Sequence, residues 1–231
     1  MSLYEREKEY IRLLSERNHK ISELSKALYI SEPTVRRDVL SMRNKDLVES
    51  RRGLVCLKAN SPDRRIPSLL RRMEHEEEKR IIAQKAANYL KEGMTIMIDA
   101  STTASCLIPF LAKHRNIVVI TSGAGTALSL ASYGINTICT GGKLLPESES
   151  YVGGDAIRTL LSYHADIAFF SCHALSEDSV ASDTSIEENE VRKVMIKQSE
   201  KSYLLCDKSK FGKKELNILC NTKELSGVIT A

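Results

Sequence analysis

Apolar side chains recur at helical spacing in three short stretches near the start of the chain. The first lies at 10–14, and the second repeats at i, i+3, i+4 and i+7 over 21–28. The third follows Ser31, a typical helix cap, and has Pro33 in its first turn, where the missing N–H costs nothing. It turns Val35, Val39 and Met42 to one face. Two such helices joined by a tight turn predict a helix-turn-helix.

The opposite face of the third stretch is polar and basic. With the valines turned inward, the outward side chains are predicted to be Thr34, Arg37, Asp38 and Ser41, with Arg36 beside them. A helix of this width fits the DNA major groove, where guanidinium groups bond guanine edges or phosphates. A hydroxyl near its N-terminus can anchor a phosphate. This pattern therefore predicts a DNA-recognition helix.

A basic ribbon is predicted directly after that helix. The segment "LVESRRGLVCLK" alternates around Arg51, Arg52 and Gly53, which is typical of two short strands joined at a tight turn. Its tip would lie along the DNA backbone, as the wing of a winged helix does. The predicted DNA-binding residues are Ser31, Thr34, Arg36, Arg37, Ser41, Arg51 and Arg52.

The rhythm of the sequence changes after a charged segment with two prolines. We predict a winged helix-turn-helix domain over 1–58, a linker over 59–75 and an α/β domain over 76–231. In the last of these, helical stretches alternate with the apolar runs "MTIMIDA", "NIVVITS" and "INTICTGG". Such alternation favours a largely parallel sheet with helices on both faces.

Hydroxyl or glycine clusters follow each of these three runs. Ligands of parallel α/β sheets bind at the carboxyl ends of the strands, so the clusters are candidates for one shared phosphate or polyol site. A cluster of this kind taken alone is more often a helix cap or a loop glycine, and it is the recurrence after three successive strands that indicates a ligand site. The candidates are Asp99, Ser101, Thr102 and Thr103, then Thr121 and Ser122, then Gly141, Gly142 and Lys143.

Charge and composition agree with this division. Of 231 residues, 42% are hydrophobic and 28% charged, which is typical of a globular protein. Residues 1–73 carry 17 Lys and Arg against 10 Asp and Glu, a net charge of +7, whereas 74–231 carry 17 against 20, a net charge of −3. The basic end fits a nucleic-acid partner. With no signal peptide or apolar run of membrane-spanning length, we expect a cytoplasmic protein without a membrane partner. The six scattered cysteines are predicted to be buried, reduced thiols.

The segment "ISELSKALYISEPTVRRDVLSM" resembles the helix-turn-helix of the DeoR-type family of bacterial sugar-responsive regulators. That family carries S-x-x-T-[VI]-R-R-D-L, which Ser31 and 34–38 match, with Val39 in place of Ile or Leu. The resemblance extends through the body, whose family fold is similar to sugar-phosphate isomerases and deaminases. The matching residues there are Asp99, Thr102, Thr103, Thr121, Gly141, Gly142, Glu188, Asp207, Ser209, Lys210 and Phe211.

The resemblance implies a regulator, most often a repressor of a carbohydrate-metabolism operon, that binds operator DNA as a homo-oligomer. A phosphorylated sugar or sugar alcohol would bind the C-terminal domain and release the DNA. It adds Glu188, Asp207 and Lys210 to the predicted effector-binding residues and implies no cofactor, metal or catalytic residue. The chain departs from the family pattern at Ser101, Ser122, His173, Ala174 and Ala181, and its C-terminal domain is expected to be short, ending at "GVITA".

Two alternatives remain open at this stage. A sugar-phosphate isomerase or deaminase would need a general acid and base, for which the candidates are Asp99, Asp166, Asp183, Glu188 and Glu190, with Lys193 or Lys210 for charge. However, the paired aspartates of the isomerase loop are absent from "YHADIAFFSCHALSED". A metal site that joins His164 and His173 to nearby carboxylates is the other alternative.

Overall fold

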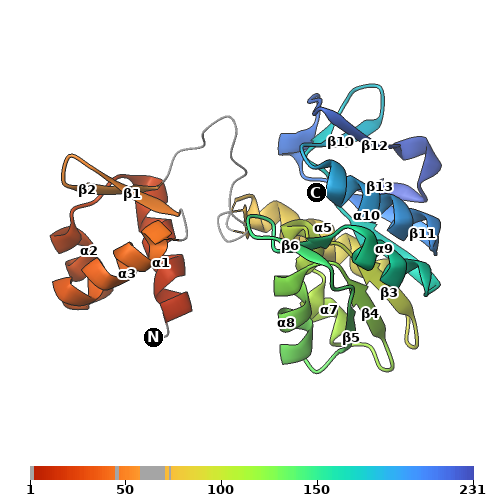
Figure 1. Cartoon of the computed structure of the whole chain (residues 1–231), viewed down its shortest axis with the longest axis horizontal. Coiled ribbons are helices and arrows are strands. Elements are labelled where there is room, and N and C mark those ends of the chain that lie inside the picture. The colour runs from red at the N-terminus through yellow and green to blue at the C-terminus, as the bar shows by residue number, and fades with distance from the viewer. Residues whose placement is uncertain (1–2, 45–46, 58–70, 73) are drawn as a thin grey trace. The chain divides into compact units, whose positions relative to one another are not determined.

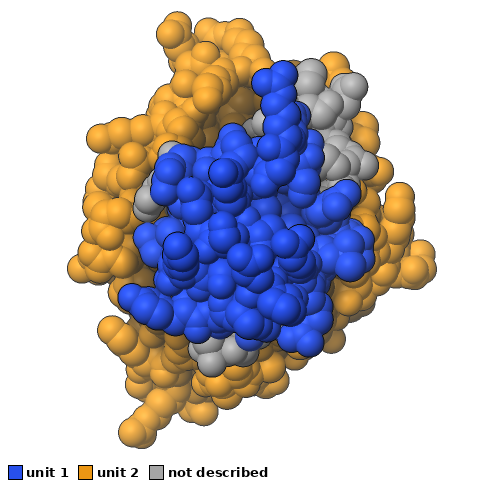
Figure 2. Space-filling model, turned by 90° about the vertical axis from the view of Figure 1, so that its left-hand side faces the viewer, with its two compact units in different colours: residues 1–71 blue, residues 72–231 orange. Residues whose placement is uncertain are grey.

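A computed structural model of the chain describes residues 3–44, 47–57, 71–72 and 74–231. The chain forms two compact units, residues 1–71 and residues 72–231, which Figure 2 colours separately. Most of the linker predicted over 59–75 lies outside the described residues, so its limits remain a prediction.

The first unit is a three-helix head with a hairpin (Figure 1). Tyr29, with a left-handed φ of 54°, ends the second helix and turns the chain into the third. The hairpin turns at Arg52 and Gly53, whose φ values of 50° and 79° suit a tight two-residue turn. The predicted winged helix is thus confirmed. Its elements are α1 (Leu3–Glu16), α2 (Ile21–Leu28), α3 (Glu32–Asn44), β1 (Val48–Arg51) and β2 (Leu54–Leu57).

The head closes around apolar residues from every one of its elements. Tyr10, Leu24, Val35 and Met42 have no exposed surface. His19, between α1 and α2, exchanges two backbone hydrogen bonds with Val55 at 3.1 and 2.7 Å, which fixes the hairpin to the helices. The predicted inward face of α3 is therefore confirmed.

The second unit is built on a six-stranded parallel sheet. The strand order is β13-β11-β8-β3-β4-β5, and every neighbouring pair is parallel. Three of these strands are the predicted apolar runs. The strands are β3 (Thr95–Ile98), β4 (Val118–Thr121), β5 (Asn136–Cys139), β8 (Ala165–Phe170), β11 (Ser199–Leu205) and β13 (Gly227–Ile229).

Helices cover both faces of this sheet, as the alternation predicts. Ile96 and Ile98 of β3 pack with the helices of one face, whereas Met97 between them packs with those of the other. The first face is covered by α5 (Glu76–Ala86), α7 (Ile108–Leu111) and α8 (Ala124–Ser132), and the second by α9 (Gly154–Leu161) and α10 (Ile186–Lys197). A short α6 (Thr102–Ser105) follows β3. The expected α/β class is therefore confirmed.

Two smaller sheets and three short 3-10 segments complete the second unit. The strand order β12-β10-β9 forms an antiparallel sheet beside the main one, and β6 pairs with β7. The bounds are β6 (Lys143–Leu145), β7 (Ser150–Val152), β9 (Ala174–Leu175), β10 (Val180–Asp183), β12 (Asn217–Asn221), η1 (Ala87–Tyr89), η2 (Lys208–Lys210) and η3 (Thr222–Glu224). Among the described residues, no helix combines the length and apolar character needed to cross a membrane.

All six cysteines are free thiols. Four are buried as expected, but Cys106 is only partly buried and Cys139 is exposed. Cys139 ends β5, the edge strand of the main sheet, which has a neighbouring strand on one side only.

The strand order places a reversal of chain direction across the sheet between β3 and β8. From β3 the chain adds β4 and β5 on one side, and then adds β8, β11 and β13 on the other. Loops leaving the two sides diverge at such a point, and ligands of open α/β sheets bind there. The residues just after β3 and β8 therefore lie where a sheet of this kind binds its ligand.

Candidate functional site

The outward face of α3 carries an exposed arginine pair. Arg36 and Arg37 are exposed, whereas Thr34 and Ser41 are partly buried. The Ser31 hydroxyl lies 2.9 Å from that of Thr34 at the start of the helix. Arg36 Nη2 is 3.5 Å from Glu32 Oε2, a long surface contact that leaves its guanidinium available to a phosphate.

Asp38 was predicted to point outward with these residues, and that prediction is wrong. Its side chain is buried, with 1% of the residue exposed. Both carboxylate oxygens accept hydrogen bonds from Arg6 of α1, at 2.7 and 3.1 Å, and Tyr10 Oη lies 3.4 Å away. Periodicity places Asp38 beside the helix's inner face, and the arginine on α1 makes its burial possible. Asp38 therefore fastens α3 to α1 and is not available to DNA.

The wing presents its two arginines at the hairpin tip. Arg51 is largely exposed, with Nε 2.7 Å from Glu49 Oε1, and Arg52 is exposed at the turn. Six of the seven predicted DNA-binding residues thus lie on α3 or on the wing of one winged-helix fold, and Ser31 directly precedes α3. Their contact with DNA stays a prediction.

Asp99 is the first polar residue of the site at the strand ends of the second unit. It directly follows β3 and is 1% exposed. Its Oδ1 accepts a hydrogen bond from the Ser101 N–H at 3.0 Å, and its Oδ2 accepts one from the Ser171 N–H at 3.2 Å. Because Ser171 directly follows β8, Asp99 joins the two strands where the direction of the sheet reverses.

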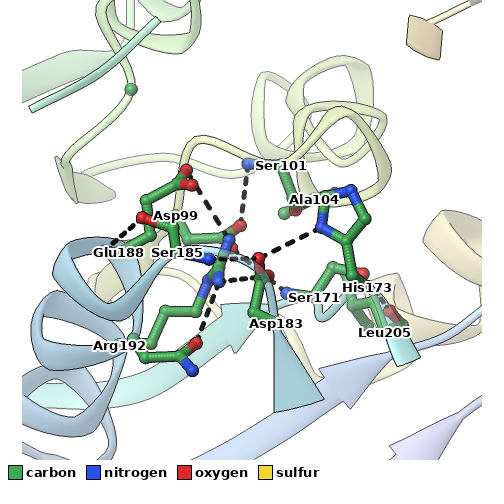
Figure 3. A network of polar contacts seen from close by, with 12 residues as sticks. Asp99, Ser101, Ala104, Ser171, His173, Asp183, Ser185, Glu188, Arg192 and Leu205 are labelled. Atoms are coloured by element: carbon green, nitrogen blue, oxygen red, sulfur yellow. Dashed lines mark hydrogen bonds and ion pairs between the residues drawn. The ribbon is translucent and has the colours of Figure 1, made fainter. Parts of the chain in front are cut away.

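Arg192, on the inner face of α10, reaches the same carboxylate. Its Nε donates to Asp99 Oδ2 at 2.9 Å, and its Nη1 donates to Asp183 Oδ2 at 2.7 Å. Glu188 Oε1, one turn earlier on the helix, is 3.8 Å from Nη2. Figure 3 shows the guanidinium between the Asp99 and Asp183 carboxylates. One buried guanidinium thus gathers three carboxylates from β3, β10 and α10.

Arg192 and Asp183 hold each other in the ionised form. Burial alone would lower the pKa of Arg192, but the carboxylates of Asp183, Asp99 and Glu188 raise it above its usual value. Burial alone would raise the pKa of Asp183, but Arg192 and His173 hold it well below its usual range. Ser185 caps α10 by accepting the Glu188 N–H at 3.2 Å, which fixes the helix that carries the arginine.

A cationic group lies beside this network, at the end of β11. Lys210 Nζ donates to the Ser171 hydroxyl at 2.7 Å and is 3.4 Å from Asp207 Oδ2. Lys79 of α5, which is 4% exposed, is electrostatically coupled to Lys210 and Asp207. Burial, and then the Lys210 charge, lower the pKa of Lys79 to about 8. Ser171 therefore joins a region rich in carboxylates to one that carries two ammonium groups.

The structure brings together only part of the predicted effector-binding set. Hydrogen bonds and ion pairs connect Asp99, Ser101, Glu188, Asp207 and Lys210 through Arg192 and Ser171. Ser101 is the predicted cap of α6 and accepts the Ala104 N–H, and the buried Thr102 and Thr103 follow it. Thr121 and Ser122 are buried at the end of β4.

The glycine cluster after β5 has a structural explanation of its own. Gly142 has a φ of 110°, and a Cβ there would come within 2.7 Å of the Val152 carbonyl oxygen. Gly141 also has a positive φ, of 64°. Lys143 is exposed at the start of β6. These residues follow the edge strand β5, two strands away from the Asp99 network, so their part in a shared site stays a prediction.

Sequence reasoning missed Arg192, Ser171 and Lys79, and named Asp183 only in the enzyme alternative. The Glu188-x3-Arg192 spacing was a usable signal, because residues four apart on a helix face the same side. Ser171 and Lys79 carry no comparable signal in the sequence. Their role depends on β8 lying beside β3 and on α5 covering the strand ends.

The structure contradicts parts of both alternatives. Asp166 Oδ2 accepts the Thr95 N–H at 2.7 Å, at the amino ends of β3 and β8 and so at the opposite edge of the sheet from Asp99. Glu190 and Lys193 pair with each other on the exposed side of α10. His164 precedes β8 and His173 follows it, which separates them by roughly 20 Å. The metal site that joins these histidines is therefore wrong.

One cluster of potential metal ligands occurs among the described residues. Single ligand atoms of His75, Glu78 and Asp207 lie within 4.8 Å of one another. Lys210 is 3.4 Å from the same Asp207 carboxylate, and the Lys79 ammonium is also close enough to interact with it. Two neighbouring ammonium groups disfavour a divalent cation there.

The fold and site define a chain with a winged helix ahead of an α/β unit whose polar site lies at its strand ends. The family described as the DeoR C terminal sensor domain matches residues 74–231, and the chain belongs to that family. YulB of Bacillus subtilis, an uncharacterized HTH-type transcriptional regulator, is 32% identical over 233 residues, which cover 100% of this chain and 89% of that protein. A lactose phosphotransferase system repressor of Staphylococcus epidermidis is 26% identical over 234 residues, covering 100% of this chain and 92% of the repressor.

A solved structure shares the fold as well. Chaetomium thermophilum eIF2B delta aligns with a TM-score of 0.52 and 18% identity, over 70% of this chain and 60% of that one. At this identity the likeness shows the fold alone. The comparisons thus establish the family.

Proposed function

We propose that the protein is a DNA-binding transcriptional repressor of a carbohydrate-metabolism operon, released by a phosphorylated sugar or sugar alcohol. The observation that carries this proposal is one chain holding both an exposed arginine pair on a winged helix and a charged strand-end network. A repressor of a lactose phosphotransferase system, similar over the whole chain, supports the sugar-related effector.

The charge distribution of the strand-end network suits a ligand with two chemically different ends. Around Arg192, the carboxylates of Asp99, Asp183 and Glu188 outnumber the guanidinium, so hydroxyl donors would find acceptors there. On the other side of Ser171, Lys210 and Lys79 offer ammonium groups to a phosphate. Thr102 begins α6, three residues after Asp99. A phosphorylated polyol would span both regions.

The effector must favour the form of the protein that binds DNA weakly, because a ligand shifts an equilibrium only by its differential affinity. We further propose that the protein acts as a homo-oligomer. Two heads related by a two-fold axis would bind two half-sites, which increases specificity beyond what one α3 helix provides.

An isomerase or deaminase is less well supported. A general base must be free to take a proton from the substrate. Here the same guanidinium holds Asp99 and Asp183, Asp166 is at the far edge of the sheet, and Glu190 is paired on the surface. The regulators that match nearly the whole chain favour ligand sensing over turnover.

DNA binding by the full chain tests the proposal. We would measure fluorescence anisotropy with the duplex upstream of the protein's own operon and with a scrambled duplex, at two salt concentrations. Aldose, ketose and alditol monophosphates of three to six carbons would be added as effectors. Arg37→Ala should weaken operator binding by about 1 to 3 kcal/mol through lost base or phosphate contacts. Arg158→Ala, an exposed arginine of the second unit, is the matched control.

The double variant Thr102→Ala and Lys210→Ala tests the effector end in the same assay. It should bind the operator as the wild type does and no longer respond to the sugar phosphate. If the wild type binds both duplexes equally, or no phosphorylated sugar releases it, the repressor proposal fails. Release of the double variant by the same compound would remove these residues from the site.

A further inference from the structure

His173 is an accessible ionisable side chain bonded directly to Asp183 of the Arg192 network. It lies three residues after β8, on the same edge of the sheet as Asp99. Its side chain is 37% exposed, whereas those of Asp99, Asp183, Glu188 and Arg192 are between 1% and 7% exposed. A molecule that approaches the network from solvent would therefore meet His173 before the buried charges.

The contact with Asp183 fixes which ring nitrogen carries hydrogen. His173 Nδ1 lies 3.2 Å from Asp183 Oδ1, as Figure 3 shows by a dashed line. Asp183 is held ionised by Arg192, and an ionised carboxylate only accepts hydrogen bonds. Nδ1 is therefore the donor, and in the neutral ring Nε2 carries a lone pair.

The second ring nitrogen, Nε2, takes no part in holding the fold together. Among the described residues no hydrogen bond to His173 Nε2 is present, and Nε2 is not one of the buried atoms that lack a partner. The three other hydrogen bonds to the Asp183 carboxylate come from Arg192 on α10 and from Thr184 and Ser185 just before that helix. The ring is thus oriented by one nitrogen and presents the other.

We propose that His173 binds the effector directly, by accepting a hydrogen bond from an effector hydroxyl at Nε2, and that it helps to decide which phosphorylated sugar is accepted. This inference rests on the proposed function. The ring is pre-oriented by Asp183, so little conformational freedom is lost when the contact forms. The hydroxyl, not the phosphate, is its partner, because Asp99, Asp183 and Glu188 already make this end of the site rich in negative charge.

Two conservative substitutions of His173 distinguish the roles of its two ring nitrogens. The amide of Asn can take the place of Nδ1 and keep the contact with Asp183, whereas the longer Gln can reach the place of Nε2. His173→Asn should weaken binding of the best monophosphate in the panel about tenfold, the worth of one hydrogen bond to a well-oriented group. His173→Gln should stay within about threefold of the wild type for the same reason. If the ring served only to bond Asp183, His173→Asn would keep the affinity and His173→Gln would lose it.

Titration calorimetry on the full chain is the measurement, with the monophosphate that releases the operator most effectively from the wild type. The matched control is His164→Asn, the histidine at the other end of β8, which should leave affinity unchanged. Melting temperatures identify any variant that fails to fold, and His173→Ala, which removes both ring nitrogens and should also weaken binding, takes the place of His173→Asn if that variant does not fold. The His173→Asn variant should also lose discrimination between monophosphates that differ in one hydroxyl.

The outcomes separate this inference from the proposed function. If no sugar phosphate releases the wild type from DNA, the proposed function fails first. If the wild type responds and His173→Asn binds every monophosphate as tightly and as selectively as the wild type, the proposed function stands and the role of His173 is overturned. A tenfold loss in Asn with recovery in Gln supports the direct contact.

Discussion

Lys79 carries an ammonium group into a nearly buried position on α5. The residue is 4% exposed, and burial followed by the Lys210 charge lowers its pKa to about 8. The Asp207 carboxylate raises the pKa of Lys79 and so offsets part of this lowering, but the net lowering means that burying this ammonium group costs stability at neutral pH. We propose that phosphate binding by the ammonium group explains the residue better than stability does.

Replacing this lysine should separate stability from function. Because the folded pKa is lower than that of an unfolded lysine, the unfolded chain binds more protons between pH 8 and about 10.5, and stability rises with pH in that window. Below pH 8 the fold bears the full cost, so Lys79→Met should stabilise the second unit at pH 7 by up to about 2 kcal/mol and lose this rise. Urea unfolding at pH 7, 8.5 and 10 measures it.

The same variant should bind sugar phosphates more weakly, so that stability and effector affinity change in opposite directions. Lys197→Met, an exposed lysine on α10, is the control and should alter neither. A Lys79→Met protein that is less stable than the wild type at pH 7 would show that the lysine supports the fold.

At the scale of elements, single buried residues decide how helices meet their neighbours. Asp38 joins α3 to α1 through Arg6, and Arg192 joins α10 to the ends of β3 and β10. In both cases the polar residue lies on a face that packing encloses. Such pairs make each helix depend on a partner far away in the sequence.

Asp38→Ala should therefore lower the stability of the head, and it should not remove a contact to DNA bases. The substitution leaves the Arg6 guanidinium and the Tyr10 hydroxyl without their partner carboxylate in a closed environment. We expect the melting transition of the head to fall by at least roughly 5 °C. Circular dichroism of the full chain, with Glu32→Ala on the exposed part of α3 as control, measures it. An unchanged transition would mean that the Arg6 contact contributes nothing to stability.

At the scale of the whole molecule, we propose that the start of the second unit helps to couple effector binding to DNA binding. Arg72, the first residue of that unit, has Nη2 3.2 Å from Glu149 Oε2. The Glu149 carbonyl accepts the Ala124 N–H at 2.8 Å. Ala124 lies two residues after Ser122, which is one of the predicted effector-binding residues. Gly125 leaves room for this ion pair, since a Cβ there would come 2.3 Å from Glu149 Oε2. The pair thus links the start of the unit to a strand-end loop.

Breaking this ion pair should weaken the release of DNA by the effector more than it weakens DNA binding or effector binding measured separately. Glu149→Gln and Gly125→Ala remove or displace the same contact, so both should raise the effector concentration that releases DNA by about three- to thirtyfold. Operator affinity without effector should change much less. The anisotropy assay measures both quantities, with Gly154→Ala as a glycine control at the start of α9. If the two variants behave differently from each other, the ion pair is not the coupling element.

The sequence alone determined the features that depend on neighbouring residues. The helical spacing of Val35, Val39 and Met42, the turn at Arg52 and Gly53, and the apolar runs of β3, β4 and β5 all follow from local preferences, and the structure has them. Asp99 and Ser101 could also be placed at a strand end for this reason. Their burial and their partners could not.

Only the tertiary structure decided which polar residues meet. Arg192 bonds Asp99 across 93 positions of sequence, because β3 and β8 are neighbours in the sheet and α10 packs across their ends. The same arrangement sends Asp166 to the far edge, and the packing of α1 against α3 buries Asp38 beside Arg6. Periodicity gives the side of an element on which a residue lies. The order and packing of elements determine what faces that side, and this order rests on contacts between segments that no local pattern encodes.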